Sequence, residues 1–249
     1  MRLKEIEKIP TAGYLGGKES LEYGLGAKQY QKLPGGSGLL YTIESSRFMT
    51  EIKLWDPRGV NAIARLPQII GQLELKSVPD FPLPGSLMVN TITVDEDYRG
   101  RGLAKALYGI VLSIMRRPLI AGSRQTPGGR QNWVSLSQIP GVEVRGFFEI
   151  EPVDINPMSD QMRQYNPERF DKFNREIERT IETIMGKIGA EFLGTGRSGR
   201  HYFAFDVLPG TTGKEMEAYV KTRLTKVYIS YMNVTAEPGA GLYAVWTGG

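Results

Sequence analysis

The alternation of hydrophobic and polar residues between residues 39 and 94 is typical of β-strands. Apolar residues repeat with a period of two, among β-branched and aromatic side chains, over residues 39–43, 51–55 and 69–75, so each segment predicts a strand. Residues 87–94, Leu-Met-Val-Asn-Thr-Ile-Thr-Val, predict a strand that is buried on both faces. Residues 56–59, Asp-Pro-Arg-Gly, predict a turn with proline at its second position.

The hydrophobic period becomes helical after residue 102. A helix is predicted over 103–115 because its apolar residues fall on one face: Leu103, Leu107, Ile110, Val111 and Ile114. Arg116-Arg117-Pro118 ends this helix, since cations are favoured at its C-terminal end and proline cannot continue it. A strand at 119–122, a short helix over 130–138 and a strand at 142–151 follow. This order of four strands, helix, strand, helix and strand predicts a fold of the α/β (α+β) class.

A second, C-terminal α+β unit is predicted over residues 156–249. Its first helix begins at Pro167, with Asn166 as the capping residue. The apolar residues of this helix form one stripe, at steps of three and four residues: Phe170, Phe173, Ile177, Ile181, Ile184 and Ile188. Strands are predicted at 190–193 and 201–207. The stripe is interpreted as a packing surface, which these strands can partly cover.

The end of the chain predicts a helix over 214–224 and a hairpin that pairs 227–232 with 242–246. The helical stripe and the free edge of this hairpin both need a covering surface. We therefore expect self-association as a homo-oligomer, or docking onto a larger assembly. The first 38 residues are rich in glycine turns and predict an extension. The expected organisation is thus 1–38, a first domain over 39–155, and the unit over 156–249.

The composition excludes several kinds of chemistry. The chain has no cysteine, which excludes disulfides, thiolate metal sites, iron–sulfur ligation and a cysteine nucleophile. Its single histidine, His201, excludes a two-histidine metal site and argues against a Ser-His-Asp triad. We expect no bound metal, and we expect His201 to be a structural residue.

Charge and hydropathy narrow the expected partners. The start of the chain has no apolar signal-peptide core, and no apolar stretch approaches the ~20 residues of a membrane span. We therefore expect a cytoplasmic protein without a membrane partner. The formal net charge of +4 is a mild basic excess without a dense Lys/Arg run. It is compatible with a phosphorylated ligand and leaves nucleic-acid binding open.

The clearest chemical signal is the loop between the strand at 87–94 and the helix at 103–115. Its sequence from residue 95 to 102, Asp-Glu-Asp-Tyr-Arg-Gly-Arg-Gly, is rich in glycine and arginine. Glycines let a ligand approach the backbone, and the first N–H groups of a helix, with its dipole, attract anions. Arg99 and Arg101 can donate charge-assisted hydrogen bonds to phosphate. The loop has neither the Gly-Lys-Ser/Thr of a Walker motif nor the third glycine of a dinucleotide fingerprint.

This loop resembles the pyrophosphate loop of the GNAT superfamily of acyl-CoA-dependent N-acetyltransferases, which reads Arg/Gln-x-x-Gly-x-Gly/Ala. The matching residues here are Arg99, Gly100, Arg101, Gly102, Leu103 and Ala104. The resemblance covers about residues 39–151 and implies a mixed sheet flanked by helices. It also implies that the loop amides bind the pyrophosphate of acetyl-CoA, and that Thr93 and Val94 bind the pantetheine amide. Residues 125–136 resemble GNAT-like proteins encoded by tailed phages.

Two positions depart from the family's pattern. Many members carry a tyrosine general acid on the helix after the fifth strand, where this chain has Trp133, and an indole N–H is not a practical proton donor. Many also carry a glutamate base on the fourth strand, but residues 86–94 contain no carboxylate. Glu74 on the preceding strand is the candidate catalytic base, and the alternative is a solvated strand residue. Positioning alone can also promote transfer from a thioester, which is already activated.

Three functions remain open at this point. The first is an acetyltransferase that transfers an acetyl group from acetyl-CoA to an amine. The second is a binding or structural protein, such as a virion component, with a degenerate GNAT-like domain, and the missing tyrosine and glutamate favour it. The third is a phage-type acyltransferase that acts on DNA bases, for which the basic excess is the only hint. A phage-encoded protein would reside in the host cytoplasm or in the virion.

Overall fold

The computed structural model describes residues 30–35, 37–60, 67–122, 125–152, 167–224, 232–233 and 240–248. Its strands are β1 (Gln31–Lys32), β2 (Leu40–Ser45), β3 (Met49–Val60), β4 (Pro67–Ser77), β5 (Leu87–Val94), β6 (Leu119–Ile120), β7 (Val142–Pro152), β8 (Ala190–Thr195), β9 (His201–Phe205), β10 (Met232–Asn233) and β11 (Ala240–Trp246). Its α-helices are α2 (Leu103–Gly109), α3 (Pro127–Leu136), α5 (Pro167–Ile188) and α6 (Gly213–Leu224).

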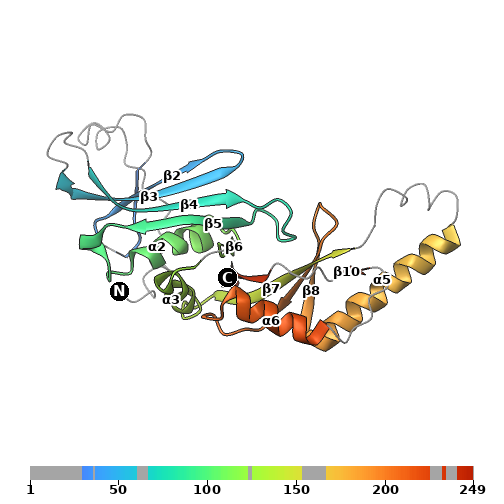
Figure 1. Cartoon of the computed structure of the whole chain (residues 1–249). Coiled ribbons are helices and arrows are strands. Elements are labelled where there is room, and N and C mark those ends of the chain that lie inside the picture. The colour runs from blue at the N-terminus through green and yellow to red at the C-terminus, as the bar shows by residue number, and fades with distance from the viewer. Residues whose placement is uncertain are drawn as a thin grey trace.

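The first half of the sheet is an antiparallel meander followed by one crossover. β2, β3, β4 and β5 pair in chain order. Helix α2 and the π-helical turn Ile110–Ile114 then lead to β6, which lies parallel to β5, as a crossover connection allows. The described strands continue as β6-β11-β7-β9-β8, with β10 beside β7. Helices α2 and α3 lie on one side of this mixed sheet (Figure 1), so the predicted α/β class is confirmed.

Residues 56–59 do not form the predicted turn, because β3 runs through them to Val60. The register between β3 and β4 shifts between Asp56 and Val60, so the segment is a β-bulge. Inside the bulge the Arg58 N–H donates to the Asp56 carboxylate at 2.9 Å. The aspartate side chain therefore takes the place of a partner strand for this backbone group, and proline and glycine are accommodated without a chain reversal.

Strand β5 is buried on one face only, so the prediction of burial on both faces is wrong. Leu87 is buried and Ile92 packs against the main core, but Asn90, Thr91 and Thr93 are exposed. Their apolar and β-branched neighbours reflect the preference of such residues for strands. The exposed side chains leave polar groups on the face of the sheet that α2 does not cover.

Strand β11 lies inside the sheet, which corrects the predicted exposed edge at 242–246. All seven of its residues pair with β7, and Tyr243 and Ala244 also pair with β6. Most of the predicted hairpin partner, residues 227–231, lies outside the described residues, and Met232 pairs with β7. Strands from the predicted segments 39–155 and 156–249 thus share one sheet. Separate folding of these segments stays a prediction.

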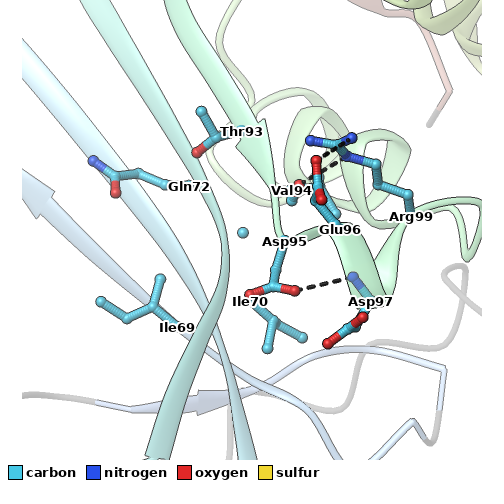
Figure 2. Close-up of a pocket in the computed structure, with 10 residues that line it drawn as sticks. Ile69, Ile70, Gln72, Thr93, Val94, Asp95, Glu96, Asp97 and Arg99 are labelled. Atoms are coloured by element: carbon cyan, nitrogen blue, oxygen red, sulfur yellow. Dashed lines mark hydrogen bonds and ion pairs between the residues drawn. The ribbon is translucent and has the colours of Figure 1, made fainter.

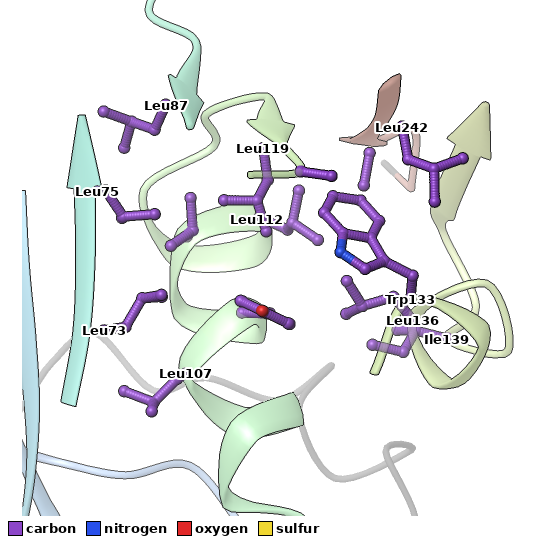
Figure 3. Packing of buried hydrophobic residues seen from close by; sticks show 14 of the residues in the cluster. Leu73, Leu75, Leu87, Leu107, Leu112, Leu119, Trp133, Leu136, Ile139 and Leu242 are labelled. Carbon is purple, nitrogen blue, oxygen red and sulfur yellow. The ribbon is translucent and has the colours of Figure 1, made fainter. Parts of the chain in front are cut away.

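The main core lies between the sheet and helices α2 and α3 (Figure 3). Its buried side chains come from both halves of the chain: Leu73, Leu75, Leu107, Leu112, Leu119, Trp133, Leu136 and Leu242. Because β11 supplies Leu242, the core is complete only when the C-terminal strand is in place. Most of the predicted extension, residues 1–29 and residue 36, lies outside the described residues.

Helix α5 packs through its C-terminal half. Ile184 and Ile188 are buried, and Ile177 and Ile181 are partly buried against the same core. The side chains of Phe170 and Phe173 lie outside the described residues. The rest of the helix extends away from the sheet (Figure 1). Among the described residues, no helix is long and apolar enough to span a membrane.

Candidate functional site

The loop after β5 is held at its start and opens towards its end. The Asp95 N–H donates to the Ile70 carbonyl at 3.0 Å, and the Asp95 carboxylate accepts the Asp97 N–H at 3.1 Å, which caps the short 3-10 turn Glu96–Tyr98. Gly100 and Gly102 follow with φ angles of 75° and 76°. This left-handed conformation favours glycine, so the backbone geometry explains why the sequence has glycine at both positions.

The backbone around the two glycines is free to bind a ligand. A Cβ placed on Gly100 or on Gly102 would meet no atom within 4 Å. The N–H groups of residues 100–104 make no hydrogen bond to another group of the described chain. Gly102 is the N-terminal cap of α2 and supplies no side-chain cap, so the first N–H groups of the helix, at Leu103 and Ala104, stay unpaired. Such groups, with the positive end of the helix dipole, suit an anion.

The two arginines of the loop bind their own backbone. The Arg99 Nε–H donates to the Val94 carbonyl at 3.3 Å, and its Nη1 lies 3.0 Å from Glu96 Oε1. The Arg101 guanidinium donates to the Asp97 carbonyl at 2.8 Å and lies 4.9 Å from the centre of the Tyr98 ring. Both side chains are exposed. They place positive charge beside the open backbone and also fix the shape of the loop.

A cleft of about 470 Å³ lies where β4 begins and β5 ends, and Figure 2 shows its walls. Residues 69–72, residues 93–97 and Arg99 line it, so it brings together Thr93, Val94 and Arg99 of the predicted site. Gly100, Arg101, Gly102, Leu103 and Ala104 are not among the described residues that line it. Three carboxylates in its wall would repel a diphosphate, so an anion is better placed at the open backbone of residues 100–104.

Strands β5 and β6 separate beside this loop. Among the described residues they pair only at Leu87 with Leu119 and at Met88 with Ile120. The next residue, Ala121, donates its N–H to the Leu242 carbonyl of β11 at 2.8 Å. The second half of β5, including Thr93 and Val94, therefore pairs with β4 on one side, and β6 does not pair with it on the other side. Unpaired strand edges bind extended amide groups, which is the role that the family resemblance implies for these two residues.

Glu74 lies on β4, directly opposite Thr91 of β5 and Glu51 of β3. Its Oε1 accepts a hydrogen bond from Gln72 at 3.1 Å, and its Oε2 accepts one from Asn90 at 3.1 Å. It is half-buried and does not line the cleft, but it shares a sheet face with Gln72, which does. Two amide side chains thus hold one carboxylate on the uncovered face near the end of β5.

Trp133 belongs to the core. Helix α3 begins at Pro127, three residues before its predicted start, because the Thr126 side chain accepts the Gly129 N–H and caps it. The helix turns Trp133 inwards (Figure 3), where the side chain is 2% exposed. Its ring centre lies 6.1 Å from that of Tyr108. Burial raises the pKa of Tyr108 to about 12, against the opposing effect of its hydrogen bond with Asn132. Neither ring is placed to donate a proton in the cleft.

The predicted structural role of His201 agrees with its surroundings. It is buried on β9, its Nδ1 lies 2.9 Å from the Thr195 hydroxyl, and its ring packs edge-on against Phe192. Burial lowers its pKa. No group of three His, Asp or Glu side chains among the described residues is arranged to hold a metal ion.

Sequence reasoning missed the residues that hold the loop from outside. The Tyr98 hydroxyl donates to Asp56 Oδ2 at 3.1 Å, and Gln68 Nε2 donates to Asp95 Oδ2 at 3.4 Å. Asp56 lies in the β3 bulge and Gln68 at the start of β4. Each partner is far from the loop in sequence, so no local pattern could reveal the pairing.

A family model matches the part of the chain that contains this site. Residues 38–123 match the family model of the acetyltransferase (GNAT) family, which is about a third of the chain. No curated protein and no solved structure gives a significant match. The matched segment contains β2 to β6, Glu74, the loop and α2, and it ends before α3.

The match supports the GNAT superfamily for this part of the chain. This agrees with the mixed sheet and helices of the structure, and it supports acyl-CoA-dependent acetyltransferase chemistry in general terms, since the family uses acetyl-CoA as its acyl donor. The resemblance of residues 125–136 to phage-encoded proteins stays a prediction.

Proposed function

We propose that this protein is an acyl-CoA-dependent N-acetyltransferase that transfers the acetyl group of acetyl-CoA to an amine. One observation carries the proposal: the loop at residues 95–102 lies in the segment that matches the GNAT family and presents unbonded N–H groups at the start of α2. Its two left-handed glycines leave open space for a ligand. A diphosphate is the part of acetyl-CoA that such a backbone would bind.

The predicted residues divide into three roles along the CoA molecule. The backbone N–H groups of Gly100, Gly102, Leu103 and Ala104 would bind the diphosphate, while Arg99 and Arg101 would supply positive charge. Thr93 and Val94, on the edge of β5 that β6 leaves unpaired, would bind the pantetheine amide. The thioester would then lie beside the uncovered face of β5, where the acceptor amine can approach.

Transfer requires an amine to attack the thioester carbonyl carbon. The carbon–nitrogen bond forms, the carbon–sulfur bond breaks, and CoA leaves as a thiolate while the amine loses a proton. Glu74 is the proposed acceptor of that proton, since Gln72 and Asn90 orient its carboxylate near the end of β5. Trp133 is buried, so the thiolate would take its proton from water. Holding the amine against the thioester supplies the rest of the catalysis.

A binding protein with a degenerate domain is the second candidate, and the position of Trp133 favours it. The side chain that stands at the family's usual tyrosine position packs in the core. Such a protein would bind CoA without turning it over. Its function would then be to bind a partner molecule, in line with the expected docking onto a larger assembly.

Titration of acetyl-CoA by calorimetry, followed by an intact-mass and thiol-release screen with amines, distinguishes these candidates. We expect a Kd in the micromolar range and release of CoA in the presence of at least one amine class. Binding without release for every amine tested would favour the degenerate domain. Absence of binding would contradict both.

A further inference from the structure

The β3 bulge is tied to the middle of the glycine-rich loop. The Tyr98 hydroxyl donates to Asp56 Oδ2 at 3.1 Å, across 42 positions of sequence. Asp56 is 5% exposed, so the carboxylate end of the contact is largely shielded from water. Its Oδ1 also accepts the Arg58 N–H at 2.9 Å and the Arg58 Nε–H at 3.1 Å. The bulge thus presents a carboxylate that is already fixed before Tyr98 binds it.

The hydrogen bond of Tyr98 supports the part of the loop that contains the two glycines. Tyr98 ends the 3-10 turn, two residues before Gly100, and the Arg101 guanidinium lies over its ring. Other contacts hold the loop at Asp95 and at the start of α2, and Arg99 and Arg101 bind the Val94 and Asp97 carbonyls. The two left-handed glycines, with open space around them, give the backbone at Gly100 and Gly102 little stiffness of its own.

We infer that Asp56 and Tyr98 are positioning residues for the diphosphate-binding loop. Neither residue belongs to the site that the sequence predicts. This inference rests on the proposed function. Their hydrogen bond fixes the direction of the N–H groups at residues 100–104, and it holds the ring on which Arg101 lies. Neither side chain needs to touch the ligand. The β3 bulge is therefore part of the binding machinery.

The test compares two tyrosines that make the same contact at different places. In the full chain, Tyr98→Phe removes the bond to Asp56, and the matched control Tyr202→Phe removes a bond to Asp80 at 2.8 Å. Each variant is titrated with CoA and with acetyl-pantetheine, which lacks the diphosphate. We expect Tyr98→Phe to weaken CoA binding about threefold to tenfold, to leave acetyl-pantetheine binding unchanged, and to speed amide exchange across residues 95–104.

Variants at Asp56 add an independent arm. Asp56→Asn keeps an acceptor for the tyrosine hydroxyl and should retain more CoA affinity than Asp56→Ala. If the parent binds CoA and Tyr98→Phe binds it equally well with unchanged exchange, the inference alone is wrong. It is also wrong if Tyr202→Phe weakens CoA binding as much as Tyr98→Phe does. If the parent binds no CoA, the proposed function is wrong, and the inference fails with it.

Discussion

The two ends of the β4–β5 pair carry loops that are fixed by the same chemical contact but have opposite surroundings. At one end the Tyr98 hydroxyl donates to Asp56, and the glycines that follow face open space. At the other end the Tyr202 hydroxyl donates to Asp80, in the connection from β4 to β5. Ser198 adds its N–H and its hydroxyl to the same carboxylate, at 2.7 and 2.6 Å.

The end at Tyr98 is called the open end, because space surrounds its glycines, and the end at Tyr202 is called the closed end, because other residues pack against it. A Cβ on Gly196, in the turn between β8 and β9, would lie 2.4 Å from the Asp80 carbonyl oxygen. Phe81 packs beside Tyr202 in an aromatic cluster on the sheet face opposite α2. The hairpin of β8 and β9 therefore contacts the β4–β5 connection closely at Gly196. A tyrosine–aspartate bond alone does not mark a site; unpaired backbone beside it does.

The largest expected effect is on turnover at the open end. Glu74→Gln keeps the size of the side chain but removes the proposed base, so kcat should fall by about 100-fold or more, with the Kd for acetyl-CoA unchanged. Steady-state kinetics and calorimetry measure both. Glu149→Gln is the matched control, since Glu149 also lies on a strand and accepts from Arg200 at 3.0 Å. Equal turnover in the two variants would remove Glu74 from the mechanism.

The next effect is on stability at the closed end. Asp80→Ala removes the carboxylate that accepts from the buried Tyr202 hydroxyl and from Ser198. We expect the free energy of unfolding to fall by about 2–3 kcal/mol, which urea titration can measure. Affinity for acetyl-CoA should stay at the parent value. A variant that keeps its stability, or that loses CoA affinity, contradicts the division between the two ends.

Acid should lower the free energy of unfolding through the aspartates at both ends, by less than the substitutions above. Burial pushes the pKa of Asp56 up, but hydrogen bonds from Arg58 and Tyr98 outweigh it, and the net pKa is lowered. Burial also opposes the lowering at Asp80, where Ser198, Tyr202 and Arg200 prevail. A lowered pKa stabilises the fold above the unfolded value of about 4. This stability is lost as pH falls through the lower folded values.

Urea titrations between pH 6 and pH 3 test this dependence. The free energy of unfolding of the parent should decrease below about pH 4. Asp80→Asn should be less stable than the parent at pH 6 and should show a shallower decrease towards pH 3. An equal slope in parent and variant would mean that Asp80 does not contribute to the acid response.

Local sequence patterns predicted the loop at residues 95–102. The contacts of that loop and the order of the strands depend on residues far apart in the sequence, which local patterns do not reveal. The residues from Val94 to Ala104 are contiguous, so strand, glycines and helix start could all be read in one segment. The partner of Tyr98 lies 42 positions away, in a segment whose Asp-Pro-Arg-Gly sequence predicts a turn. The place of β11 between β6 and β7 depends on pairing across about 100 residues or more. Period and composition predict that strand but not its neighbours.

Residues 100–104 are proposed to bind the diphosphate of acetyl-CoA, and one matched pair of glycines can test this binding. Gly102 and Gly38 have φ angles of 76° and 73°, and a Cβ on either would meet no atom within 4 Å. The same substitution therefore strains both equally, while only Gly102→Asp adds a negative charge at the proposed site. In calorimetric titrations with acetyl-CoA, Gly38→Asp should bind like the parent, and Gly102→Asp should bind at least tenfold more weakly, ~1.4 kcal/mol. A folded Gly102→Asp that binds as tightly as Gly38→Asp would mean that residues 100–104 do not bind the diphosphate.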